Sequence, residues 1–374
     1  MSRSPLDYSI NKPLSSRFNP LVFIFKDLIL FFSLVGVLSF GLFMLYSASG
    51  QSMSMVYRQM IYICGGLILM VFVSQLRPNS YKNLLMHSYW LGLFLLIYVL
   101  IIPAKGYETS RWIDFGFFSF QPSEIIRLIL PLSLVAYLCR KEIKPQLSDW
   151  LVTSAASLIC AFFVYKQPDL GTAIIVLTSG LIPIYLAGLP FKIIASYFGL
   201  LIVSTPFIWS GLRPYQQERV LTLLDPDADP LGTGWNIAQS QTAIGSGGLY
   251  GKGYLEGTQS QLDFIPESHS DFIFAVIAEE LGLIGISILF LAYALIIFRI
   301  FSIAYGSETI FGRLASTSIG FIFLIFILIN VSMVVGIIPV VGVPLPLVSQ
   351  GGTSLATHLL AFGFVLSVKR KSGW

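Results

Sequence analysis

Asp271 is the residue in this sequence that is best placed to act as a general base. It ends a polar, glycine-rich stretch at 210–270 and directly precedes a long apolar run. A carboxylate at such a boundary can take a proton from a bound hydroxyl group. The same carboxylate could instead cap the following helix or be stabilised by the helix dipole, although Ser270 could serve equally well as the cap.

A second candidate feature is the glycine-rich turn around Lys252, which Gly251 and Gly253 flank. Backbone N–H groups in such a turn can bind phosphate oxygens, and the ammonium group would add a positive charge. The residue order that defines a Walker motif is absent. The turn by itself is therefore only a weak indication of phosphate binding.

Glu124 and Arg127 are three residues apart and follow Pro122, which suits the first turn of a helix. We expect both side chains on one face of that helix, inside an apolar segment. Ionisable groups in a membrane span are costly and are often functional. An ion pair that holds the helix against its neighbours is an equally good interpretation, and the two roles can coexist. For Asp169, a cap on a helix that begins near Leu170 is favoured over direct contact with a ligand.

The composition indicates an integral membrane protein. Of the 374 residues, 55% are hydrophobic and only 11% are charged, whereas soluble domains carry about 25% charged residues. A bilayer-crossing helix needs roughly 20 mostly apolar residues. We predict an all-α fold with about ten transmembrane helices, near 28–48, 57–76, 83–102, 121–139, 149–165, 171–187, 191–209, 271–298, 313–336 and 353–368.

The distribution of basic residues predicts the orientation of the chain. With the N-terminus in the cytoplasm, inner segments hold fifteen Lys and Arg residues and outer segments hold seven. This bias favours a cytoplasmic position for both termini. Residues 1–374 then form one polytopic membrane domain, with a large ordered extracytoplasmic loop at 210–270 between spans seven and eight. The outer basic residues include Arg111, Lys166, Arg219 and Lys252.

Several other functions and sites are disfavoured by the sequence. Nucleic-acid binding would need a clustered basic face, which is absent. The three cysteines show neither metal-ligand nor disulfide spacing. The acidic turn at 225–230 is more typical of a solvated loop than of a metal site, so we predict no metal site built from protein ligands. The Pro- and Gly-rich stretch at 336–354, by contrast, suggests a broken element that lines a cavity.

A series of motifs in one order along nearly the whole chain resembles the SEDS (shape, elongation, division and sporulation) family of bacterial cell-wall polymerases. The motifs include Arg111-Trp112-Ile113, Gln121-Pro122-Ser123-Glu124, Gln167-Pro168-Asp169-Leu170-Gly171-Thr172, Tyr215-Gln216 with Arg219, Gly251-Lys252-Gly253, Asp271-Phe272-Ile273-Phe274, Glu279-Glu280-Leu281-Gly282 and Pro344-Leu345-Pro346. The segment at 257–262 favours the elongation branch over the division branch, whereas the sporulation branch is harder to separate.

The resemblance implies a peptidoglycan glycosyltransferase in the bacterial cytoplasmic membrane. Its substrate would be lipid II, an undecaprenyl-diphosphate-linked disaccharide-pentapeptide, polymerised on the outer face of the membrane during cell elongation. The implied partners are a class B penicillin-binding protein transpeptidase, other elongation-complex membrane proteins and membrane lipid, with no nucleic acid. No cofactor is required by the motifs, although a divalent cation such as Mg²⁺ or Mn²⁺ between Asp271 and the diphosphate stays open.

The resemblance also assigns roles to single residues. It makes Asp271 the essential carboxylate and general base, and Glu124 the acid of a second motif. The family usually has Lys where this chain has Arg127, and guanidinium does not give up its proton. We expect Arg111, Lys166, Arg219 and Lys252 to bind the diphosphate, and Glu124 with Arg127 to position a helix or the substrate. Direct displacement with one base predicts inversion at the anomeric carbon.

Two other functions fit the same spans and acids. One is a lipid II flippase, because broken helices and intramembrane acids are typical of transporters. The other is a non-catalytic membrane scaffold that recruits a class B penicillin-binding protein. The concentration of polar motifs on one face of the membrane favours the enzyme, because alternating access needs gates on both sides.

Overall fold

The computed structural model describes residues 27–102, 111–114, 119–140, 145–225, 233–262 and 264–369. Most of the acidic turn at 225–230 and the basic residues before Asp27 and after Lys369 lie outside these ranges. The expectations about that turn and those terminal charges therefore stay predictions.

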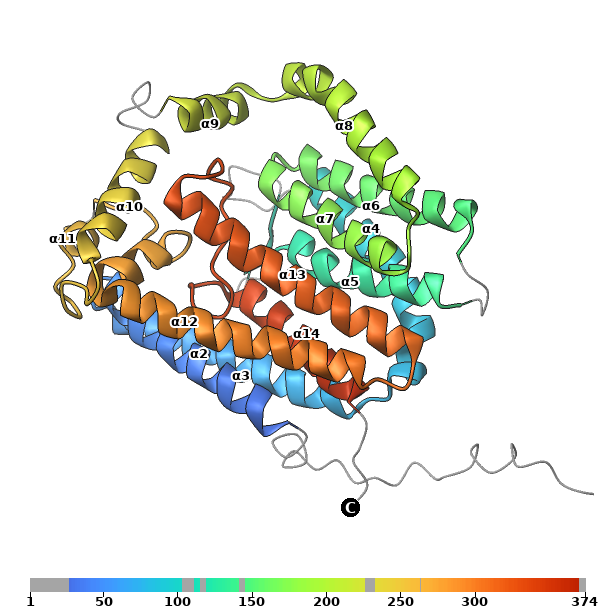
Figure 1. The fold of residues 1–374 in the computed structure, drawn as a ribbon, viewed down its shortest axis with the longest axis horizontal. Coiled ribbons are helices and arrows are strands. Elements are labelled where there is room, and N and C mark those ends of the chain that lie inside the picture. The colour runs from blue at the N-terminus through green and yellow to red at the C-terminus, as the bar shows by residue number, and fades with distance from the viewer. Residues whose placement is uncertain are drawn as a thin grey trace, which may run out of the picture.

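Each of the ten predicted spans corresponds to one helix of the bundle (Figure 1). These helices are α2 (Leu28–Ala48), α3 (Met53–Gln75), α4 (Pro78–Ile101), α5 (Pro122–Leu138), α6 (Leu147–Lys166), α7 (Leu170–Leu186), α8 (Phe191–Gly211), α12 (Ile273–Tyr305), α13 (Ile310–Val335) and α14 (Gly352–Val368). Within the described ranges, seven of them are long and apolar enough to cross a membrane. The other three, α5, α7 and α14, have 17 residues each, which is at the lower limit for a span.

The described part of the long loop is folded into three helices. These are α9 (Pro214–Leu224), α10 (Thr233–Gly247) and α11 (Thr258–Gln261). α10 packs against α12 and α13, and α9 lies across the ends of α7 and α13 in Figure 1. The loop therefore covers one end of the bundle.

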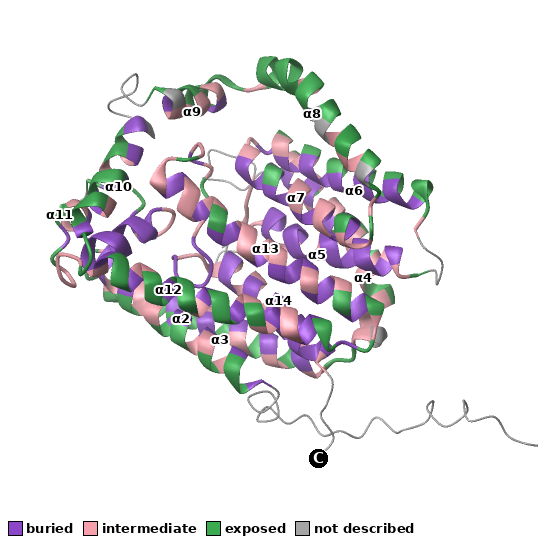
Figure 2. Ribbon diagram, viewed as in Figure 1, coloured by how far each residue is buried: buried purple, intermediate pink, exposed green. Residues whose placement is uncertain are grey.

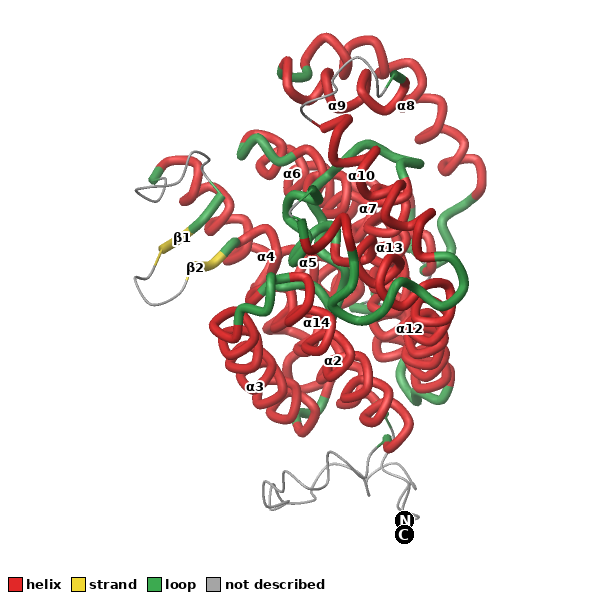
Figure 3. Tube along the Cα trace, turned by 90° about the vertical axis from the view of Figure 1, so that its left-hand side faces the viewer, coloured by secondary structure: helices red, strands yellow, loops and turns green. Residues whose placement is uncertain are grey.

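The described chain is nearly all helical, which agrees with the all-α prediction, apart from one pair of very short strands. Two short strands, β1 (Ile113–Asp114) and β2 (Ser119–Phe120), pair antiparallel, with Ile113 opposite Phe120. Figure 3 shows this pair projecting beside the helices. Strands of two residues are too short to show an alternation of apolar and polar residues, so the sequence pattern does not reveal them.

Burial differs strongly between the helices (Figure 2). α5, α14 and the first part of α12 are mostly buried, whereas α8 exposes apolar side chains along its length. α14 packs closely against α3, α4 against α5, and α12 against both α2 and α13. Two of these buried elements, α5 and the first part of α12, carry the predicted acids Glu124, Glu279 and Glu280.

Asp27 joins three helices at the end of the bundle where the described chain begins and ends. Its carboxylate accepts hydrogen bonds from Arg299 Nε at 2.7 Å and from Lys369 Nζ at 3.0 Å. It also caps α2 by accepting from Leu30 N at 3.0 Å. The side chain is buried, so the two cations compensate a charge that has little contact with solvent.

We predict that Asp27→Ala lowers the thermal unfolding midpoint of the purified protein in detergent. The loss should correspond to about 3 kcal/mol, because Arg299 and Lys369 lose a buried anionic partner and α2 loses its cap. Asp27→Asn should keep the cap and lose only the charge, giving a smaller effect. Glu256→Ala, at an exposed position, is the control. Equal midpoints for Asp27→Ala and the wild type would contradict this account of the cluster.

Candidate active site

Two of the predicted site residues, Arg111 and Arg219, line a cavity of about 420 Å³. Its walls come from the start of α7, from α9 and from the segment 338–342 that follows α13. The polar and charged residues in its lining are Arg111, Asp169, Tyr215, Gln216 and Arg219. The remaining lining is mainly aliphatic, so the cavity offers a few charged groups in apolar surroundings. The predicted cavity-lining role of the Pro- and Gly-rich segment is confirmed by Pro339 and Gly342.

Asp271 lies against the wall of this cavity. A Cβ atom at Gly342, which lines the cavity, would be 3.5 Å from Asp271 Oδ2. The backbone of Asp271 is fixed by Asn330, whose Nδ2 donates to Asp271 O at 2.9 Å and to Val343 O at 2.7 Å. One buried amide therefore holds the backbone of Asp271 beside the segment that follows the cavity wall.

The electrostatic surroundings of Asp271 suit a base near neutral pH. Burial raises the pKa of its carboxyl group to about 6, and the negative charge of Glu267 acts in the same direction. Arg219 lowers the pKa and Asp169 raises it by smaller amounts. General bases work best when their pKa is close to the working pH. Arg219 and Asp169 both line the cavity, so two of the charges that act on Asp271 lie in its walls.

Arg111 and Asp169 form one wall of the cavity as a bonded unit. Arg111 Nε donates to Gln167 O at 3.0 Å, another of its nitrogens donates to Pro168 O, and its Nη1 is 3.6 Å from Asp169 Oδ2. Asp169 Oδ1 accepts from Thr172 N at 3.0 Å, which confirms the predicted cap of α7. Asp169 thus caps a helix and lines the cavity at the same time.

Arg219 contributes the second cation. Its Nη1 donates to Val340 O at 3.0 Å, and its guanidinium carbon is 5.8 Å from the centre of the Tyr215 ring. Tyr215 in turn donates its hydroxyl to Pro168 O at 2.7 Å. These bonds tie α9 to both other walls of the cavity. Among the described residues, Val340 is the one hydrogen-bond acceptor of a guanidinium that has five N–H donors.

Gln216 belongs to one of the motifs that carry the family resemblance, although the sequence assigned it no role in the site. Its Oε1 accepts from Arg213 N at 3.0 Å. Its Nε2 is buried and has no hydrogen-bond partner among the described residues. Buried polar atoms are rarely left unpaired, so this donor is available to an oxygen atom of a molecule in the cavity. Asn330 was also missed, although an amide inside a long apolar run is a recognisable signal.

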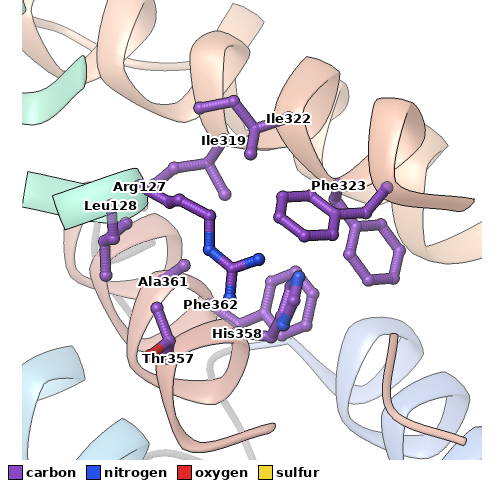
Figure 4. A pocket seen from close by; sticks show the side chains of 10 residues that line it. Arg127, Leu128, Ile319, Ile322, Phe323, Thr357, His358, Ala361 and Phe362 are labelled. Atoms are coloured by element: carbon purple, nitrogen blue, oxygen red, sulfur yellow. The ribbon is translucent and has the colours of Figure 1, made fainter. Parts of the chain in front are cut away.

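Glu124 and Arg127 form the predicted ion pair, with Arg127 Nη2 3.4 Å from Glu124 Oε1. Thr353 at the start of α14 donates its hydroxyl to Glu124. The Arg127 guanidinium lies 4.7 Å from the Phe326 ring centre and borders a separate cavity of about 30 Å³ (Figure 4). The pair therefore joins α5 to α13 and α14 inside the core, and neither residue lines the larger cavity.

Lys252 and Lys166 are not brought together with the other cations. Lys252 Nζ donates to Glu279 Oε1 at 2.8 Å and to Thr258 Oγ1 at 2.7 Å. Lys166 is exposed at the end of α6 and lies 5.4 Å from the Phe162 ring centre. Neither residue lines the 420 Å³ cavity. Their predicted contact with the diphosphate stays a prediction that the geometry does not favour.

The described residues include no group of three or more His, Cys, Asp or Glu side chains that could hold a metal ion. The divalent cation considered between Asp271 and the diphosphate therefore stays a prediction.

Comparisons with known proteins cover nearly the whole chain. The family model of the FtsW/RodA/SpoVE cell cycle proteins matches residues 19–373. The peptidoglycan glycosyltransferase MrdB of Escherichia coli K12 is 43% identical over 336 residues, which are 90% of this chain and 91% of that protein.

Two solved structures have the same fold. One belongs to a study of how a peptidoglycan synthase complex coordinates polymerization and crosslinking, with a TM-score of 0.80, 30% identity, and coverage of 91% of this chain and 97% of that one. The other is the rod shape determining protein RodA of Thermus thermophilus, with a TM-score of 0.69, 26% identity, and coverage of 91% and 96%. With a family model over almost its full length and a relative at 43% identity, the chain belongs to the FtsW/RodA/SpoVE family.

Proposed function

We propose that this protein is a peptidoglycan glycosyltransferase that polymerises lipid II into glycan strands during cell elongation. The activity is that of its relative MrdB, and the fold is that of RodA. The observation that carries the proposal for the site is the position of Asp271 against a cavity that Arg111 and Arg219 also line. A base and two cations around one apolar cavity fit a sugar linked to a diphosphate and a lipid.

In the proposed reaction, Asp271 removes the proton from the 4-hydroxyl group of the acceptor sugar. The resulting oxygen nucleophile attacks the anomeric carbon of the donor, and the bond from that carbon to the diphosphate breaks. Arg111 and Arg219 stabilise the negative charge that develops on the departing undecaprenyl diphosphate, which is usually the largest contribution to catalysis of this kind. The attack from the opposite face inverts the anomeric carbon.

The proposed setting is the bacterial cytoplasmic membrane, with ten spans, both termini in the cytoplasm and the cavity on the outer face. The excess of basic residues in the inner segments supports this orientation. The three 17-residue helices complete the ten spans by packing inside the bundle. The similarity to a chain from a peptidoglycan synthase complex supports a class B penicillin-binding protein and other elongation proteins as partners.

We predict that Asp271→Asn abolishes polymerisation of lipid II by the purified protein and leaves its thermal unfolding midpoint nearly unchanged. The amide keeps the size of the side chain but cannot take a proton. Glycan product is measured on a gel with the protein alone and with its partner transpeptidase. Glu256→Gln, at an exposed position of the same loop, is the control.

The same variants separate the enzyme from its two rivals. A flippase would move labelled lipid II across vesicle membranes without making glycan. A non-catalytic scaffold would keep its function when Asp271 is replaced by Asn. Full glycan synthesis by Asp271→Asn would remove this residue from the role of base. Repeating the assay with a chelator, and then with added Mg²⁺ or Mn²⁺, tests whether a divalent cation contributes.

We predict that kcat/KM rises with pH through about 6, because Asp271 has to be deprotonated to act as a base and burial places its pKa near that value. Glu267→Gln removes a nearby negative charge, so the pKa falls and the rise moves to lower pH. Arg219→Gln removes a positive charge, so the pKa increases and the rise moves to higher pH while the overall rate falls.

Initial rates of lipid II polymerisation between about pH 5 and pH 8 measure these shifts. The decisive result is that the two pH profiles move in opposite directions, because a general loss of stability would not move them apart. A pH profile that neither substitution moves would show that another group titrates.

A further inference from the structure

α12 is interrupted nine residues after it begins. Gly282 has φ 61° and ψ −161°, which is not helical. Every residue from Phe272 to Glu280 is buried, whereas Leu283 and Ile284 after the break are exposed. α12 therefore consists of a short buried segment, 273–281, and a longer outer segment. The short segment starts two residues after Asp271.

The loop segment 248–253 bonds to the backbone groups that this break leaves free. On one side, Lys252 N donates to Glu279 O at 2.9 Å and Gly253 N donates to Glu280 O at 3.1 Å. On the other side, Leu283 N donates to Gly248 O at 3.0 Å and Ile284 N donates to Leu249 O at 3.1 Å. Free backbone groups are costly in a membrane, so the loop segment completes the broken helix.

Gly251 and Gly282 make this close approach of two backbones possible. Both have positive φ, 78° and 61°, which glycine adopts readily. A Cβ atom at Gly251 would overlap Glu280 O, and one at Gly282 would overlap Gly251 N. The loop and the short helical segment therefore fit together only with glycine at both positions.

Side chains add a second connection between the same two segments. The fully buried carboxylate of Glu279 accepts from Lys252 Nζ at 2.8 Å. It also accepts from the backbone N atoms of Gln259 at 2.9 Å and Ser260 at 3.1 Å. Two of the three donors of the Lys252 ammonium group are used within this cluster.

We propose that Lys252 and Glu279 are positioning residues that fix Asp271 from the far end of segment 273–281, and that Lys252 does not contact the diphosphate. The seven helical residues 273–279 span about 10 Å, so a tilt at Glu279 moves Asp271 relative to Arg219. The other end of the segment is held independently, because Ser349 Oγ donates to Ser270 O at 2.6 Å. This inference rests on the proposed role of Asp271 as the base.

The test is a double-mutant cycle with Lys252→Met, Glu279→Gln and the combined variant, assayed as purified full-length protein with lipid II. Each single substitution should lower kcat by between about tenfold and a hundredfold with KM within about twofold, because the base is misplaced but the substrate still binds. The combined variant should be no slower than the slower single variant, because both changes break one contact.

Controls separate a local effect from a general one. Lys192→Met and Glu256→Gln change exposed residues of the same types and should retain wild-type rates. Lys252→Arg keeps the positive charge and should recover part of kcat. If Lys252→Met does not elute as a folded protein in size-exclusion chromatography, Lys252→Gln takes its place in the cycle. A raised KM for Lys252→Met, with additive losses in the combined variant, would overturn the proposal and make Lys252 a substrate contact.

A readout without catalysis distinguishes this proposal from the proposed function. Asp271→Cys is introduced after Cys64, Cys139 and Cys160 are replaced by alanine, and its reaction rate with a water-soluble methanethiosulfonate is measured. Lys252→Met or Glu279→Gln should change that rate several-fold, whereas Glu256→Gln should not. An unchanged rate would overturn the positioning role. If Asp271→Asn retained polymerisation, the proposed role of Asp271 as the base would fail, while this measurement would still report how residue 271 is held.

Discussion

The interior of a bilayer offers no water to backbone N–H and C=O groups, and the irregular parts of this protein depend on that constraint. Where α12 breaks at Gly282, the loop segment 248–253 supplies partners for the groups on both sides of the break. Near the end of α13, the amide of Asn330 bonds to the backbone oxygens of Val343 and of Asp271, two residues before α12 begins. The same bonds that satisfy the backbone also fix Asp271, so stability and function share one set of contacts.

The cavity uses its few charges in different ways. Arg111 directs its guanidinium to carbonyl oxygens and to Asp169, and thereby builds the wall. Arg219 has a single carbonyl partner among the described residues and faces the same space. Fixed charges in apolar surroundings act more strongly on a developing charge than they would in water. The electrostatic interaction between Arg219 and Asp271 links the cation that would stabilise the leaving group to the base.

The buried ion pair of Glu124 and Arg127 illustrates how a motif can have a structural role beside a functional one. It lies between α5, α13 and α14, and Thr353 and Phe326 complete its surroundings. The pair therefore connects α5 with α13 and α14 in the core. Removing one partner of such a pair leaves an uncompensated buried charge.

The sequence alone determined the ten helices, the cap at Asp169 and the spacing of Glu124 and Arg127, because apolar length, proline position and helical periodicity are local properties. The pairing of β1 with β2 and the break at Gly282 left no such local signal. Only the tertiary structure decided that Arg219 and Arg111 share a cavity beside Asp271 while Lys252 bonds to Glu279. In the sequence, Arg111 and Arg219 cannot be told apart from Lys252 by role, because all three are basic residues of outer segments. Their partners lie tens of residues away, where packing of the helices, not spacing along the chain, decides which groups meet.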